Sequence, residues 1–229
     1  MLTEEKVAVR RETVTDVQAL DRVHGPCRPS WLGAAAKRLI DLVGAALMIF
    51  LLAPAFVILA LLVAADDGWP VIYRRRVVGK EGEFDAFKFR SMRRDAEAIL
   101  NANPALRAEF ARNFKLKNDP RVTRVGAHLR KVSLDELPQL FNVLAGQMSF
   151  VGPRMITAAE LEKYGVQKKL VMSVKPGLTG YWQVNGRQTV SYEERVKMDV
   201  YYIEHWSLLL DLKILLLTPL KVLQREGAY

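Results

Sequence analysis

The most apolar stretch of the chain, residues 42–65, contains no charged side chain. Its length of about two dozen residues is enough to cross a lipid bilayer. Lys37 and Arg38 precede it and a second basic cluster follows at residues 74–80. Because basic flanks stay in the cytosol, a crossing helix would carry one cluster across the membrane, whereas a re-entrant helix keeps both on one side. Pro54 is expected to kink the helix, and both topologies stay open at this point.

The pattern after this stretch is that of a folded unit with short elements. Residues 70–73 and 84–89 alternate between apolar and polar side chains and predict two strands that pair as a small sheet. Residues 93–114 are rich in helix formers and are interrupted by an Asn-Pro pair, which predicts two short helices meeting at a turn. A further helix is expected from about residue 136 to residue 145.

The C-terminal part, residues 206–224, places many leucines on a helix whose only charges are Asp211, Lys213 and Lys221. Such a helix is typical of one that lies against lipid, and an ordinary core helix is the alternative. The expected fold class is therefore mixed α/β and mostly helical, with a membrane helix and an interfacial helix attached to a small folded unit.

Composition narrows the classes of partner and site. Lys and Arg outnumber Asp and Glu by 34 to 25, and the net charge of +9 favours phosphates, nucleic acid or an anionic membrane as partners. Cys27 is the only cysteine, which excludes an intrachain disulfide, a cysteine zinc site and an iron–sulfur cluster. The histidines lack the spacing of a metal site. Residues 1–30 are charged throughout and show no signal peptide, so the chain's chemistry is expected in the cytosol.

Two adjacent carboxylates, Asp135 and Glu136, are the main candidates for chemistry. Ser133 and Glu136 fit a capping box, in which both side chains only satisfy amides at a helix start. Pro138 favours a helix that begins nearer Asp135, because with Ser133 as the cap the proline would fall past the first turn. Both carboxylates would then lie at the positive end of a helix dipole, available to a metal or a phosphorus centre. The residues alone leave both interpretations open.

Three segments combine basic residues with glycines or aromatic residues and indicate phosphate binding. They are Lys88 to Arg90, Gly152 to Arg154, and Gly177 to Arg187. Arginine can bind two phosphate oxygens at once, and glycines let backbone amides approach a phosphate closely. Taken singly, each segment also fits an ordinary solvated charge.

Read together, the segments "FKFRSM", "LRKVSLDELPQLFNVLAGQMSFVGPR" and "KPGLTGYWQVNGR" resemble the bacterial sugar transferases, the monotopic phosphoglycosyl transferases that begin extracellular polysaccharide assembly. The resemblance covers residues 37–229 and is strongest to the short, exopolysaccharide-initiating members. The chain departs from the family at Ala53, where a serine usually precedes the kinking proline, and at Met155, where a second proline usually follows the arginine.

The resemblance implies roles for individual residues and a division of the chain. Asp135 would be the catalytic nucleophile and Glu136 the ligand of a magnesium ion. Residues 1–36 would be a variable leader, residues 37–70 a re-entrant membrane helix kinked at Pro54, and residues 71–229 a catalytic domain at the cytosolic face. The residues expected to contact phosphate or substrate are Lys88, Arg90, Arg130, Arg154, Gln183, Arg187 and Asp199.

The implied reaction moves a hexose 1-phosphate, with galactose or glucose as the sugar, from a UDP-sugar to undecaprenyl phosphate. It would release UMP, pass through a covalent Asp135–phosphosugar intermediate, require Mg²⁺ and take place at the inner membrane of a bacterium. Nucleic acid is not expected as a partner, and a homodimer stays open. The alternative function is a basic membrane adaptor that binds anionic lipid or a partner enzyme and catalyses nothing.

Overall fold

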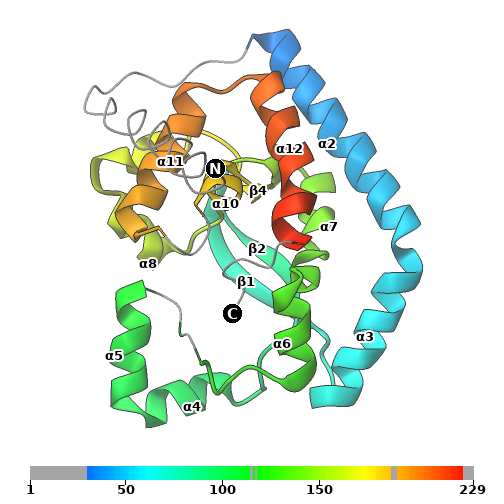
Figure 1. Ribbon diagram of the computed structural model, residues 1–229, viewed down its shortest axis with the longest axis vertical. Coiled ribbons are helices and arrows are strands. Elements are labelled where there is room, and N and C mark those ends of the chain that lie inside the picture. Colours follow the sequence, from blue (N-terminus) through cyan, green and yellow to red (C-terminus); the bar gives the residue numbers. More distant parts are fainter. Residues whose placement is uncertain (1–29, 114–115, 117, 187–189, 224–229) are drawn as a thin grey trace, which may run out of the picture.

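The computed structural model describes residues 30–113, 116, 118–186 and 190–223, so most of the expected leader over residues 1–36 lies outside the described part. The described chain is mostly helical, with two small sheets (Figure 1). This agrees with the mixed α/β class expected from the sequence.

Two helices, α2 (Trp31–Leu51) and α3 (Ala53–Asp67), carry the long apolar stretch along one side of the molecule (Figure 1). They meet at an angle of 64°, and the break falls at Leu52. Pro54 lies in the first turn of α3, where its missing N–H costs least, so the expected bend begins two residues before the proline. Alone, neither helix has the length and apolar composition of a membrane span; the two satisfy both criteria only as a bent pair.

The hairpin of β1 (Ile72–Gly79) and β2 (Gly82–Phe89) confirms the expected small sheet. The first strand begins later than expected and continues into the basic cluster, which the sequence did not predict. Its antiparallel register pairs Ile72 with Phe89 and Tyr73 with Lys88. Because opposed residues point to the same face of a sheet, Lys88 shares a face with Tyr73. The two helices expected within 93–114 are also present, as α4 (Ala96–Ala102) and α5 (Pro104–Asn113).

The helix expected from about residue 136 is shorter than predicted. A 3₁₀ turn, η2 (Leu134–Glu136), comes first, and α7 (Gln139–Leu144) begins only after Pro138. The capping-box interpretation is wrong, because Ser133 has a left-handed backbone (φ 58°) and its side chain makes no capping bond. The expected helix start near Asp135 is wrong as well, so the two carboxylates precede α7 in a separate turn.

Further helices surround the hairpin and a second sheet. The second sheet pairs β3 (Ser149–Val151) in parallel with β4 (Gly177–Thr179). The remaining elements are α6 (Arg124–Lys131), α8 (Ala158–Leu161), η3 (Glu162–Gln167), α9 (Lys168–Val171), α10 (Tyr181–Asn185), α11 (Tyr192–Glu204) and α12 (Leu208–Leu223).

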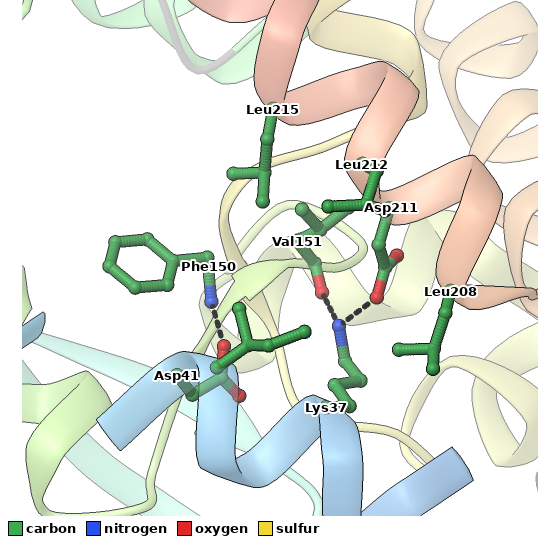
Figure 2. A pocket seen from close by; sticks show the side chains of 9 residues that line it. Lys37, Asp41, Phe150, Val151, Leu208, Asp211, Leu212 and Leu215 are labelled. Carbon is green, nitrogen blue, oxygen red and sulfur yellow. Dashed lines mark hydrogen bonds and ion pairs between the residues drawn. The ribbon is translucent and has the colours of Figure 1, made fainter. Parts of the chain in front are cut away.

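The basic flank before the apolar stretch fastens α2 to the rest of the fold. Lys37 Nζ lies 2.6 Å from Asp211 Oδ2 of α12 and 2.9 Å from the carbonyl oxygen of Val151 (Figure 2). One turn later, Asp41 accepts a hydrogen bond of 2.9 Å from the backbone N–H of Phe150. Arg38 donates to the last carbonyl groups of α7. The charged side chains at the start of α2 therefore all have partners within the protein.

Helix α12 has one buried side and one exposed side. Ile214 is 1% exposed and belongs to the main core, whereas Leu209 and Leu216 are more than two-thirds exposed. The same division holds for α2, where Ala45 is buried and Phe50 is exposed. Exposed apolar side chains thus lie along both helices, which are neighbours in the fold (Figure 1).

Candidate active site

A broad, open cleft of about 2080 Å³ is lined by the β1–β2 hairpin, the η2 turn and parts of α4, α6, α10, α11 and α12. It is larger than the pocket of a typical small ligand. The sequence-predicted residues in its lining are Lys88, Arg90, Arg130, Asp135, Glu136, Arg154 and Gln183. Asp199 is not part of the lining, and Arg187 lies outside the described residues.

The two carboxylates enter the cleft from the tight turn that Ser133 opens and Pro138 ends. Asp135 is 7% exposed. Lys88 reaches across from β2 and places its Nζ 2.5 Å from Glu136 Oε1. The acidic pair is therefore held between two elements that are separated by 48 positions in the sequence.

Charge and burial shift the pKa values of the two carboxyl groups in opposite directions. Burial raises the pKa of Asp135, and the nearby cations Lys88 and Arg130 only partly oppose this effect. Burial acts in the same direction on Glu136, but Lys88, Arg154 and Arg75 together hold its pKa below the ordinary value. Two adjacent acids with pKa values shifted in opposite directions are typical of a catalytic pair with distinct roles.

Arg130 reaches the site because α6 packs very closely on the segment after β2. A Cβ at Gly126 would lie 2.1 Å from the carbonyl oxygen of Ser91, so only glycine permits this contact. Arg130 Nε then donates to Ser91 Oγ at 2.8 Å. Burial lowers the pKa of Arg130, and Asp135 counters this by favouring the charged form.

Arg90 faces a different set of partners. Its Nη2 donates to the carbonyl oxygens of Asp67 and Gly68 at 2.7 and 2.5 Å and lies 3.3 Å from the Asp67 carboxylate. These contacts tie the end of α3 to the hairpin. A contact between Arg90 and phosphate stays a prediction.

Arg154 follows β3 in a loop that two glycines make possible. A Cβ at Gly177 would lie 2.1 Å from the backbone nitrogen of Gly152, so these glycines let the β3 and β4 chains approach each other. The guanidinium carbon of Arg154 lies 5.5 Å from the centre of the Trp182 ring, a cation–π distance. Met155, which stands where the family usually has proline, is 2% exposed and fills the core.

Two arginines of the cleft were missed from the sequence. Arg75 lies 2.7 Å from buried Glu160, and Arg195 lies over Trp182. Arg75 stands two positions after Tyr73 on β1 and therefore on the face that also carries Lys88. Strand alternation could have indicated this placement. For Arg195, the sequence carries no comparable local signal.

Asp199 lies behind the cleft. It is 1% exposed and accepts a hydrogen bond of 2.8 Å from the Tyr164 hydroxyl. Burial raises the pKa of Asp199 to about 6, although Arg195 and Tyr164 act against the shift. Gln183 does line the cleft, and its amide donates to the Leu178 carbonyl oxygen at 3.2 Å.

The donor set for a metal ion is small. Within the described part of the chain, no cluster of three or more His, Cys, Asp or Glu side chains forms a metal site. Mg²⁺ commonly binds through one or two carboxylates and completes its shell with water and substrate phosphates. Glu136, whose low pKa keeps it ionised, and the neighbouring Asp135 fit that smaller requirement.

The family model described as bacterial sugar transferase matches residues 32–225. The UDP-galactose-lipid carrier transferase of Erwinia amylovora is 52% identical over 198 residues, which cover 84% of this chain and 41% of that protein. The UDP-glucose:undecaprenyl-phosphate glucose-1-phosphate transferase of Klebsiella pneumoniae is 40% identical and is also covered to 41%. Exopolysaccharide production protein ExoY of Rhizobium meliloti is 43% identical over 210 residues, 90% of this chain and 92% of that protein.

Proposed function

The chain belongs to the bacterial sugar transferase family, and on that premise we propose that it moves a hexose 1-phosphate from a UDP-sugar to undecaprenyl phosphate. The observation that carries the proposal is a buried carboxylate, Asp135, that opens into a large cleft between Lys88 and Arg130. The names of the relatives point to galactose or glucose as the sugar and to exopolysaccharide production as the process.

In the first step, the Asp135 carboxylate attacks the phosphorus that bears the sugar. A bond forms between a carboxylate oxygen and phosphorus, the bond to the bridging oxygen of the diphosphate breaks, and UMP leaves with that electron pair. The products are UMP and an acyl-phosphate that joins Asp135 to the sugar phosphate. Lys88 and Arg130, already oriented in a cleft wall, stabilise the charge that develops on phosphorus oxygens.

In the second step, a phosphate oxygen of undecaprenyl phosphate attacks the same phosphorus. Asp135 is released as a carboxylate, and undecaprenyl-diphosphate-hexose is formed. Removing UMP before the lipid binds lets one cleft serve both substrates in turn. Atoms and charge balance without an oxidant, a reductant or a water molecule.

Glu136, with Asp135 beside it, would hold Mg²⁺. The ion would supply positive charge that neutralises the diphosphate. In this chain, Lys88, Arg154 and Arg75 lower the pKa of Glu136 and so keep its carboxyl group ionised.

The lipid acceptor requires the cleft to lie at a membrane surface. The exposed apolar faces of α2, α3 and α12 are of the kind that contacts lipid. The bend at Leu52 fits a helix pair that enters the membrane and returns, which keeps the folded unit at the cytosolic face of the inner membrane.

The test is UMP release by the purified chain with Mg²⁺, undecaprenyl phosphate and a panel of UDP-sugars. We expect release with UDP-galactose or UDP-glucose, and none from the Asp135→Asn variant. Without acceptor, intact-mass spectrometry should show one added sugar phosphate on the wild type only. A chain that binds anionic liposomes but releases UMP from no UDP-sugar would instead be the membrane adaptor.

A further inference from the structure

The cations of the cleft fall into two groups, according to the carboxyl group on which they act. Lys88 and Arg130 act on Asp135, the proposed nucleophile. Arg154 and Arg75 act on Glu136 together with Lys88. The second group extends to α11, because Arg154 and Arg195 of α11 both lie against the ring of Trp182.

Trp182 is the centre of this second group. The guanidinium carbons of Arg154 and Arg195 lie 5.5 and 5.3 Å from the centre of its ring. Arg195 also lies 4.4 Å from the ring centre of Tyr192 and donates to the Tyr192 hydroxyl at 3.2 Å. All four side chains line the cleft. Aromatic rings thus hold two guanidinium groups in place without neutralising them.

The group holds three arginines, of which only Arg75 forms an ion pair among the described residues. Tyr164 and Asp199 raise the pKa of Arg195 against the effect of its burial. Glu160 pairs with Arg75 at 2.7 Å, whereas no carboxylate among the described residues forms an ion pair with Arg154 or Arg195. Burial lowers the pKa of Arg154, and the charges of Arg195 and Arg75 act in the same direction, whereas Glu136 and Glu160 oppose the shift. Like charges held together in a partly buried site are costly unless an anion binds between them.

Hydrogen-bond donors without partners also indicate that an anion binds to this group. Trp182 is 8% exposed, and its Nε1 has no hydrogen-bond partner within the described part of the chain. The Nε of Arg195 is likewise without a partner there. Buried donors of this kind are rarely left unpaired. A phosphate, which has several acceptor oxygens, is the kind of ligand that binds such donors.

We propose that Arg195, with Arg154, Arg75 and Trp182, forms a second phosphate subsite that binds the nucleotide-side phosphate of the donor and then the phosphate of UMP. The inference rests on the proposed function and deepens it. Cleavage of the diphosphate requires one phosphate beside Asp135 and the other farther away, and the cations that act on Asp135 are Lys88 and Arg130, not those of this group. Negative charge grows on the leaving phosphate during the first displacement, so cations at this position favour the departure of UMP.

The test compares UMP binding by the full chain and by its Arg195→Gln variant, using calorimetry in lipid nanodiscs with Mg²⁺. We expect Arg195→Gln to weaken UMP binding about ten-fold or more, since a hydrogen bond between charged groups is worth about 1.5–3 kcal/mol. The KM for the UDP-sugar should rise, while the KM for undecaprenyl phosphate stays unchanged. Arg107→Gln is the matched control, because Arg107 is exposed on α5 and does not line the cleft.

Other outcomes overturn the inference. UMP affinity within about two-fold of wild type in Arg195→Gln, or a loss confined to undecaprenyl phosphate, rules out a nucleotide-side subsite. Absence of UMP binding to the wild type does so too. If Arg195→Gln unfolds, Arg195→Lys takes its place. Lysine keeps the charge but loses the fork of donors, so we expect weaker UMP binding than in the wild type. Failure of the proposed function is seen separately, as a wild type that binds UMP but releases none from any UDP-sugar.

Discussion

Lys88 and Glu136 form an ion pair, with 2.5 Å between Nζ and Oε1, that fastens β2 to the η2 turn. The lysine acts on both carboxylates of the cleft. It lowers the pKa of Glu136, and it opposes the burial that raises the pKa of Asp135. A single strand residue thus influences how much of the proposed nucleophile is ionised at a given pH.

Replacing Lys88 by methionine should therefore change the pH dependence of the reaction. In the proposed reaction Asp135 must be ionised to attack, so we expect kcat/KM to fall as the pH drops through the pKa of Asp135. Lys88→Met removes a cation that lowers this pKa and should move the acidic limb of the pH–rate profile to higher pH, besides reducing kcat/KM. Lys80→Met, an exposed change at the tip of the same hairpin, is the control. An acidic limb that stays in place would contradict the assigned role of Lys88.

Local signals made part of this fold predictable from the sequence. Alternating strands and the Asn-Pro break depend on neighbouring residues, and β2 and the pair α4–α5 appear where those signals were found. Most of β1 lies beyond the predicted residues 70–73. The turn that presents Asp135 was not predictable, since a serine in the left-handed region has no sequence signature of its own. The motif identified both carboxylates, but their distance from the start of α7 came only from the structure.

Most of the structural features that the sequence did not predict depend on contacts between distant parts of the chain. Arg75 meets Glu160 across 85 positions, and Lys37 meets Asp211 across 174. In the sequence, the basic residues beside the apolar stretch indicated only membrane orientation. Their use in ion pairs depends on the packing of α2, α8 and α12, which no local pattern encodes.

The raised pKa of Asp199 predicts a pH-dependent stability. An unfolded chain would lose this proton near 3.8 and the folded chain at about 6. The contribution of Asp199 to stability is therefore fully present below 3.8 and is lost as the pH rises through about 6. The loss from this group is on the order of 3 kcal/mol. Asp199→Asn should remove this component from denaturant unfolding measured across that pH range. Tyr164→Phe, which deletes a hydrogen bond that lowers the Asp199 pKa, should extend the decline to higher pH. If the free energy of unfolding changed with pH in the same way in wild type and Asp199→Asn, burial would not raise the pKa of Asp199.

The buried pair at the α2–α12 junction should contribute more to stability than an exposed pair. Asp211 accepts hydrogen bonds from Lys37, Tyr202 and Trp206, and Asp211→Ala removes all three; Figure 2 shows the bond from Lys37. We expect the free energy of unfolding to fall by about 3 kcal/mol. Glu162→Ala breaks an exposed ion pair with Lys168 and should cost less than about 1 kcal/mol. Equal losses in the two variants, measured by denaturant unfolding in micelles, would mean that the junction does not hold α2 in place.

Pro54 should determine whether the bent helix pair returns to the side from which it enters. Alanine at this position restores an amide N–H that can bond to the Phe50 carbonyl group and removes the clash of the proline ring, so Pro54→Ala should straighten the break at Leu52. We would place single cysteines at Ser30 and Lys80, in a Cys27→Ser background, and label them with a membrane-impermeant maleimide.

With the wild-type bend, both cysteines should react only from the cytosolic side of the membrane. In Pro54→Ala, a fraction of the molecules should react at residue 30 from the opposite side, because a straight apolar helix of this length can cross. Pro104→Ala, at the start of α5 and far along the chain from this break, should leave the labelling unchanged. If the two wild-type cysteines reacted from opposite sides, the pair would cross the membrane despite its bend, and one basic flank would lie outside the cytosol.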